Sequence, residues 1–280
     1  MTKTVNSAFS PLLEPRRFFA ETRDQCRHST GLAGMLLRAR LAQLYRYSSL
    51  GLLWAVVPTL AITVGVTLSL HAPTQPATPG EVPLQVHVAF GVVLMQTFVE
   101  AFNGQRSIFD LHLQLLQRMK FPLEAVVMAQ IAESGFNLLA KLPVLLLVLV
   151  FFGVPLEPQM LLGLLACVPV LLAGIALGAL TAPISALGKD LDRAMAFVPW
   201  LVFLATPVFY RTPEVGPWAW LQAINPLTTL LDVARYLSYG GGSPHWSTFW
   251  ITLVALALCL LLGLVVCKLA PPRLAERLSA

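Results

Sequence analysis

Three polar side chains interrupt one long apolar run of this chain at intervals of four residues: Glu133, Asn137 and Lys141. On a helix this spacing places them on one face, because residues four apart lie one turn above one another. Glu133 and Lys141 are then about 12 Å apart along the axis, too far to pair directly. Charged groups inside a membrane span face other helices or water. If the run crosses a membrane, these residues either clamp neighbouring helices together or line a polar path.

Other reactive residue types do not form a catalytic or metal-binding pattern in the sequence. The Gly-Lys pair at 188–189 is followed by Asp190, and it lacks the upstream glycine of a phosphate-binding GxxxxGK[ST] loop. The five histidines are scattered, and the four cysteines include no CxxC pair. We therefore expect no enzymatic activity and no cofactor or metal in this chain, with any energy source on another polypeptide.

The composition is typical of an integral membrane protein. Of the 280 residues, 56% are apolar and 12% are charged, and the mean hydropathy is +0.72, whereas about a quarter of the residues of soluble domains are charged. Gly174 and Gly178, four apart in one apolar run, permit close helix packing. The expected fold is all-α, with a membrane domain at 50–270 between an N-terminal segment (1–49) and a tail (271–280). Runs long enough to cross a bilayer predict six transmembrane helices, at 50–70, 86–102, 125–152, 160–185, 194–210 and 248–269.

The basic residues predict the orientation of these spans. The N-terminal segment, the 103–124 loop and the 186–193 loop hold eight, three and two of them, respectively, and the C-terminal residues from Lys268 onward hold three. The loops on the other side hold Arg211 and Arg235. Because loops rich in Lys and Arg stay in the cytoplasm, both termini are expected there. The net charge of +5 thus indicates topology, and we expect no nucleic-acid partner.

The N-terminal segment predicts an amphipathic helix that lies on the cytoplasmic leaflet. Apolar residues recur there with helical spacing, and arginines flank them. Such a helix sits in the membrane interface, with its arginines near anionic headgroups. The apolar stripe is Met35, Leu37, Leu41 and Leu44, and the arginines are Arg38, Arg40 and Arg46.

Residues 213–240 predict a helical hairpin that re-enters the outer leaflet between the fifth and sixth spans. Asn225 followed by Pro226 is a helix-start signal. Asp232 and Arg235 can pair on the second helix because they are three residues apart. A run of three glycines then ends that helix.

Aromatic residues concentrate near the first and fifth predicted spans. Two interpretations stay open: an aromatic belt at the membrane interface, or the lining of a conduit whose ring faces contact the C–H surfaces of a sugar polymer. The residues concerned are Trp54, Phe197, Trp200, Phe203 and Tyr210.

The segment 110–121, in the first cytoplasmic loop, has the pattern of a short amphipathic helix. Asp110 can cap it, and Pro122 disfavours its continuation. Leu111, Leu115 and Met119 share one face. The spacing leaves two alternatives: a surface helix with no further role, or a docking element for a cytosolic protein.

Four linked motifs occur in a fixed order from about Arg38 to the C-terminus. They are YRYSSLGLLWAVVPTL at 45–60, LQLLQRMKFPLEAVV at 113–127, SALGKDLDRAMAFVPWLVFLATPVFY at 185–210 and LQAINPLTTLLDVARY at 221–236. In these motifs the chain resembles the membrane subunits of ABC exporters for lipid-linked polysaccharides, the O-antigen, capsule and teichoic-acid permeases. The stretch GKDLDR at 188–193 departs from the R-Y-R-D usual in that family, which bears on the identity of the polymer.

The resemblance implies that 110–121 is the coupling helix, which sits in a cleft of the ATP-binding subunit. It implies a homodimer with two copies of a cytosolic ABC ATPase, and ATP and Mg belong to that partner. The residues expected to contact the ATPase are Leu115, Leu116, Arg118, Met119, Lys120 and Phe121.

The resemblance also implies a lipid-linked polysaccharide cargo that is translocated across the bacterial inner membrane. Arg38, Arg40 and Arg46 lie at the depth of a lipid diphosphate and can pair with it, although general attraction to anionic membrane lipids is the alternative. For the aromatic residues the resemblance favours the conduit. The rival functions are an ABC exporter of another lipid or a drug, and an ion-coupled secondary transporter.

Overall fold

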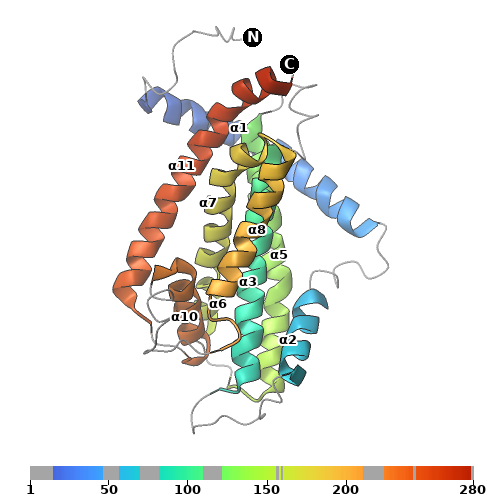
Figure 1. Cartoon of the computed structure of the whole chain (residues 1–280), viewed down its shortest axis with the longest axis vertical. Helices are drawn as coiled ribbons and strands as arrows, with labels where there is room; N and C mark the ends of the chain where they lie inside the picture. The colour runs from blue at the N-terminus through green and yellow to red at the C-terminus, as the bar shows by residue number, and fades with distance from the viewer. Residues whose placement is uncertain are drawn as a thin grey trace.

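The computed structural model describes residues 15–46, 57–69, 82–109, 122–155, 158, 160–210, 224–241 and 244–278. All regular secondary structure within these ranges is helical, as the all-α prediction requires. The helices shown in Figure 1 are α1 (Pro15–Arg46), α2 (Val57–Ser69), α3 (Leu84–Arg106), α5 (Leu123–Phe151), α6 (Met160–Leu165), α7 (Val168–Ser185), α8 (Lys189–Ala205), α10 (Pro226–Tyr239) and α11 (Trp246–Leu278).

Four segments among the described residues are long and apolar enough to cross a membrane: Leu84–Arg106, Leu123–Phe151, Met160–Ser185 and Trp246–Ala270. They correspond to the second, third, fourth and sixth predicted spans. The first predicted span begins outside the described residues, and α2 contributes 13 residues to it. α8, a helix of 17 residues, overlaps the fifth predicted span over residues 194–205. The count of six therefore stays a prediction.

Helix α3 lies at the centre of the bundle and packs most extensively against α7. This close approach depends on Gly174 and Gly178, as the sequence predicts. A Cβ atom at Gly174 would lie 2.6 Å from the Phe98 carbonyl oxygen, and one at Gly178 would lie 2.5 Å from the Phe102 carbonyl oxygen. Real Cβ atoms do not come so close to backbone atoms, so only glycine permits this packing.

The fourth predicted span is one apolar run but two helices. α6 ends at Leu165, and α7 begins at Val168 with Pro169 in its first turn. Proline has no N–H to donate to the preceding turn, so the run breaks at residues 166–167. The short helix α6 then packs against α10.

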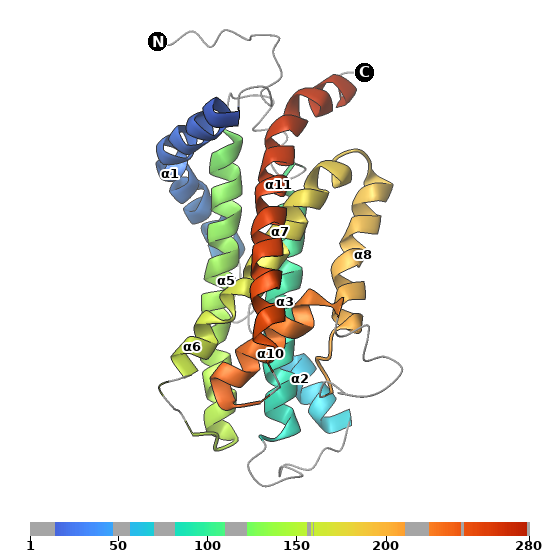
Figure 2. The ribbon, with the colours of Figure 1, turned by 90° about the vertical axis from the view of Figure 1, so that its left-hand side faces the viewer.

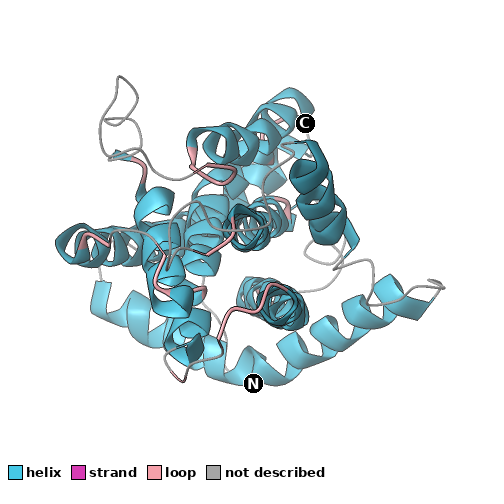
Figure 3. Cartoon of the chain, turned by 90° about the horizontal axis from the view of Figure 1, so that it is seen from below, coloured by secondary structure: helices cyan, strands magenta, loops and turns pink. Residues whose placement is uncertain are grey.

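Helix α1 is one helix of 32 residues, longer than the amphipathic stretch expected from the sequence. It lies across one end of the bundle and packs along α5 (Figures 1 and 3). Ser29 and Ala33 are buried, whereas Met35 is 68% exposed. Of the predicted apolar stripe, Met35 thus lies on the open side of α1, whereas Leu37 and Leu41 are half-buried.

Helix α10 begins and ends as the local sequence predicts. The Asn225 side-chain oxygen accepts a hydrogen bond from the Leu227 backbone N–H at 3.0 Å, and Pro226 opens the first turn. Gly240 ends the helix with φ 75°, a left-handed conformation that glycine adopts at little cost. The first helix of the predicted hairpin lies outside the described residues, so the hairpin as a whole stays a prediction.

Candidate functional site

One end of the bundle gathers the segments that the sequence predicts to be cytoplasmic. The end of α3, the start of α5, the turn between α7 and α8, and the C-terminal part of α11 all lie there, and α1 crosses this end (Figures 1 and 2). On α11 the helix continues to Leu278, so most of the segment expected as a tail is helical.

The predicted coupling segment 110–121 joins α3 to α5 at this end. Its residues, including Leu115, Leu116, Arg118, Met119, Lys120 and Phe121, lie outside the described part of the chain. The residues that flank it are firmly packed. Ile108 and Phe109 before it share one hydrophobic cluster with Val126 and Val127 after it. Both ends of the connector are therefore attached to the same rigid part of the bundle.

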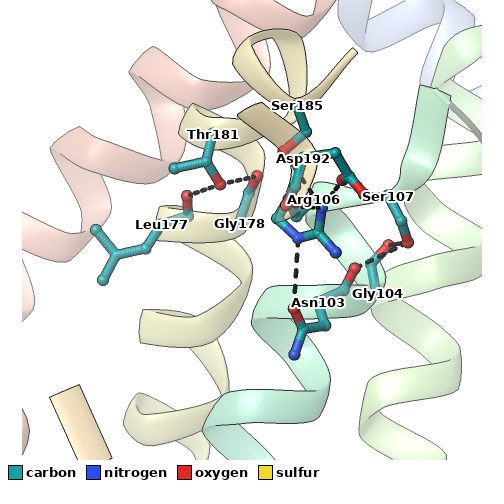
Figure 4. A network of polar contacts seen from close by, with 9 residues as sticks. All are labelled: Asn103, Gly104, Arg106, Ser107, Leu177, Gly178, Thr181, Ser185 and Asp192. Carbon is teal, nitrogen blue, oxygen red and sulfur yellow. Dashed lines mark hydrogen bonds and ion pairs between the residues drawn. The ribbon is translucent and has the colours of Figure 1, made fainter. Parts of the chain in front are cut away.

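Arg106 links three helices immediately before this connector (Figure 4). Its guanidinium forms an ion pair with the Asp192 carboxylate on α8 and donates to the Asp192 carbonyl oxygen at 3.1 Å. It also lies 3.4 Å from the Ser185 hydroxyl at the end of α7 and donates to the Asn103 side-chain oxygen at 3.3 Å. Because Arg106 is buried, α3 is held to the α7–α8 turn by charge as well as by apolar packing.

Lys268 makes an equivalent link immediately after the connector. Its ammonium group on α11 lies 3.2 Å from the Glu124 carboxylate in the first turn of α5. It also donates to the Gln25 side-chain oxygen of α1 at 2.8 Å. The start of α5 is therefore joined to both terminal helices at the same end of the bundle.

Arg40 anchors α1 to α5. Its guanidinium donates to the Glu133 carboxylate at 2.6 Å and to the Gln130 side-chain oxygen, and both members of the ion pair are mostly buried. Arg38 is exposed on the same helix, and the side chain of Arg46 lies outside the described residues. Two of the three predicted phosphate-binding arginines thus have different environments. Arg40 faces the protein, and Arg38 faces away from it.

We expect Arg40→Ala to loosen α1 from α5, whereas Arg38→Ala leaves α1 in place. A hydrogen bond to a charged group contributes about 1.5–3 kcal/mol, and the Arg40 variant loses two of them. Amide hydrogen exchange of residues 27–43 in the detergent-solubilised protein measures the opening of this helix. Equal protection in the two variants would contradict the anchoring role of Arg40.

Lys141 also pairs with another helix rather than within α5. Its ammonium group is fully buried and lies 2.6 Å from the carboxylate of Glu100 on α3. Glu133 and Lys141 thus have separate partners on α1 and α3, which is the geometry that an interhelical clamp requires. Asn137, between them on α5, is half-buried.

The aromatic residues near the fifth predicted span divide between the surface and the core. Phe197, Trp200 and Tyr210 are exposed, whereas Phe203 is 9% exposed and belongs to the main hydrophobic cluster. The Phe203 ring contacts the rings of Trp200 and Phe209, with centroids 6.1 and 5.5 Å away. In this single chain Phe203 therefore lies behind the exposed aromatic face of α8. Trp54 lies outside the described residues.

Arg235 holds the opposite end of the bundle together. It is fully buried, and it pairs with Asp232 at 3.8 Å, as the three-residue spacing predicts. Its guanidinium also donates to the carbonyl oxygens of Pro207 and His87, at 3.1 and 3.4 Å. Arg235 was expected in an outer loop, but the structure buries it between α10, α3 and the end of α8.

The sequence did not predict the partners of Arg106 and Lys268. These two residues were used only to predict which side of the membrane is cytoplasmic. Their partners could have been looked for nearby, because both residues lie at the ends of spans that meet on one side of the membrane. Asp192 and Glu124 both follow the start of a helix at that side, where a carboxylate is favourable.

No group of three or more His, Cys, Asp or Glu that could hold a metal occurs in the part of the chain that the structure describes.

Comparison with known protein families assigns this chain to one of them. No curated protein matches the chain. The profile of the family described as "ABC-2 type transporter" matches residues 32–239, from the second half of α1 to the end of α10. This chain therefore belongs to the ABC-2 type transporter family, whose members are membrane components of ABC transporters and work with an ABC ATPase subunit.

Proposed function

We propose that this chain is the permease subunit of an ATP-driven exporter that moves a lipid-linked polysaccharide across the bacterial inner membrane. The observation that carries the coupling role is the attachment of the connector 110–121. Arg106 before it and Glu124 after it are each paired with a charged residue of another helix. A displacement of the connector is then passed to α8 and α11, because packed helices move as rigid bodies.

The polysaccharide cargo rests on the four motifs that resemble the permeases of such exporters, at 45–60, 113–127, 185–210 and 221–236. In this proposal the end of the bundle that α1 crosses is cytoplasmic, because sixteen of the nineteen basic residues belong to segments predicted to lie on that side. Two copies related by a two-fold axis form a path wide enough for a hydrated glycan. Each copy binds one ATPase subunit, which supplies ATP and Mg.

Arg38 and Arg40, two of the three predicted phosphate-binding arginines, have different tasks in this proposal. Arg40 is already engaged by Glu133 and Gln130 and positions the helix. Arg38 is exposed on α1, so of these two it is the one that can pair with a lipid diphosphate.

The proposal predicts that Met119→Asp combined with Phe121→Asp abolishes binding of the ATPase subunit. A carboxylate placed at a residue that is buried against the ATPase loses its water without gaining a partner. Co-purification of tagged permease with the ATPase measures the binding. ATP-dependent movement of a polyprenyl-diphosphate-linked oligosaccharide into proteoliposomes measures transport, and both are expected to be lost.

Gln117→Asp is the control, because it adds a carboxylate to the same segment at a residue that is not among the expected ATPase contacts. It is expected to retain both the complex and transport. An intact complex in the double variant contradicts the docking role of 110–121. A wild-type complex that transports a drug or a simple lipid, but not the oligosaccharide, contradicts the proposed cargo.

A further inference from the structure

Glu100 is an unusual residue of the central helix. α3 packs against α2, α5, α7, α8 and α10, and every residue of Leu84–Arg106 except Glu100 is buried or half-buried. The Glu100 side chain is 43% exposed. The most enclosed helix of the bundle thus shows one open position, and a carboxylate occupies it.

The depth of Glu100 makes its exposure informative. A helix of 23 residues is about 34 Å long, and Glu100 lies six residues, about 9 Å, from its end. A hydrocarbon core of about 30 Å that is centred on this helix includes this position. A carboxylate inside a span is not stable against lipid tails, so it faces protein or water.

Lys141 contacts only one side of the Glu100 carboxylate. Its ammonium group is fully buried and lies 2.6 Å from a Glu100 oxygen. Lysine reaches this oxygen from the α5 side, so it leaves the open face of the carboxylate uncovered. A carboxylate has about four acceptor sites, which leaves acceptors directed away from α5.

Two amides extend the polar face of α3 on either side of Glu100. Gln96 and Asn103 are four residues before and three residues after it, so all three lie on one face. The Gln96 oxygen accepts a hydrogen bond from the Thr59 hydroxyl of α2, and the Asn103 oxygen accepts one from Arg106. Both amides are half-buried, and their NH2 groups have no described partner among the residues that the structure covers. This face therefore presents donors and an acceptor together.

We infer that Gln96, Glu100 and Asn103 line the water-filled route through the permease and hydrogen-bond to the hydroxyl groups of the transported carbohydrate. Hydroxyl groups both donate and accept, so they match a carboxylate flanked by amide donors. The carbohydrate part of this inference rests on the proposed function. The presence of water along this face does not, and the two are tested separately.

The first test measures the access of water to this face in the membrane-embedded full chain. Cys26 and Cys259 are replaced by Ala, and Cys167 and Cys267 are retained because both are buried. Gln96→Cys, Glu100→Cys and Asn103→Cys, each made alone in this background, are then treated with a membrane-impermeant methanethiosulfonate. Leu139→Cys and Leu147→Cys are the controls, since these side chains of α5 are 64% and 65% exposed and apolar.

Thiolate is the reactive form and does not form in hydrocarbon, so labelling at 96, 100 and 103 is expected to be at least about tenfold faster than at 139 and 147. Labelling of the three positions at the rate of the two controls would overturn the inference. That result leaves the family and the docking role untouched, because neither depends on the environment of Glu100.

The second test separates a role in transport from the role of Glu100 as the partner of Lys141. Glu100→Leu with Lys141→Met removes both charges together, which leaves no unpaired buried charge. This double variant is expected to bind the ATPase normally but to transport the oligosaccharide about tenfold more slowly, since one carboxylate contact of about 1.4 kcal/mol is lost. Transport at the wild-type rate would show that Glu100 serves only the ion pair and would overturn the hydroxyl-binding role.

Discussion

Replacing Arg235 with Leu will prevent recovery of folded protein from the membrane. The change removes the ion-pair partner of Asp232 and the donors to the carbonyl oxygens of Pro207 and His87. Breaking a buried ion pair by removing one partner costs about 3–5 kcal/mol, a large part of the stability of a typical domain. The yield of monodisperse protein and its thermal unfolding in detergent measure the effect.

The neighbourhood of Arg235 explains why no other side chain can substitute for it. A Cβ atom on Gly91 would lie 2.5 Å from an Arg235 guanidinium nitrogen, so α3 keeps a space for the planar group. α3 and α8 share a second charge pair, Arg106–Asp192, but it lies at the other end of the bundle. Arg235→Lys keeps the charge but loses the forked geometry, and its stability is expected to fall between that of wild type and Arg235→Leu.

The chain contains a matched control with the same residue types and spacing. Asp190 and Arg193 also form an ion pair three residues apart, at 3.6 Å, but their side chains are 100% and 76% exposed. Exposed pairs contribute little to stability because water screens them. Arg193→Leu is therefore expected to unfold like the wild type. Equal loss of stability in both variants would mean that burial is not what makes Arg235 important.

The second large effect is expected at the seam between α3 and α7. Gly174→Leu combined with Gly178→Leu will force these helices apart, because each new side chain meets backbone atoms of Phe98 or Phe102 that cannot rotate away. Overpacking costs about 1–3 kcal/mol at each site. α3 also carries the residues that flank the connector, so ATPase binding is expected to fall with stability. Thermal unfolding and co-purification measure the two effects.

Gly135→Leu on α5 is the control for a glycine inside a span. A Cβ atom there meets nothing within 4 Å, and leucine is a better helix former than glycine by up to about 1 kcal/mol. This control is expected to be as stable as wild type or slightly more so. If Gly135→Leu lowers stability and the double variant at Gly174 and Gly178 does not, the close packing of α3 against α7 does not depend on these two glycines.

Local patterns in the sequence predicted the parts of the fold that depend on neighbouring residues. The apolar runs predicted six spans, and four of them coincide with described helices that are long and apolar enough to cross a membrane. The Asn225-Pro226 start, the Asp232–Arg235 pair and the Gly240 end of α10 are confirmed as well. Each of these features is set by residues a few positions apart, where chain geometry leaves few alternatives. The ordered motifs likewise indicated the transporter family, which the match over 32–239 confirms.

Partners that lie far apart in the sequence were decided by the tertiary structure alone. The spacing of Glu133 and Lys141 predicts that they share a face and cannot pair, but it does not say which helix each one meets. Arg40 is 93 residues from Glu133, and only the packing of α1 and α3 against α5 selects the partners. The burial of Arg235 and the exposure of Glu100 have the same origin. The burial of a charged residue on a helix can be known only when the neighbouring helices are placed, because the loss of its hydrating water depends on what covers it.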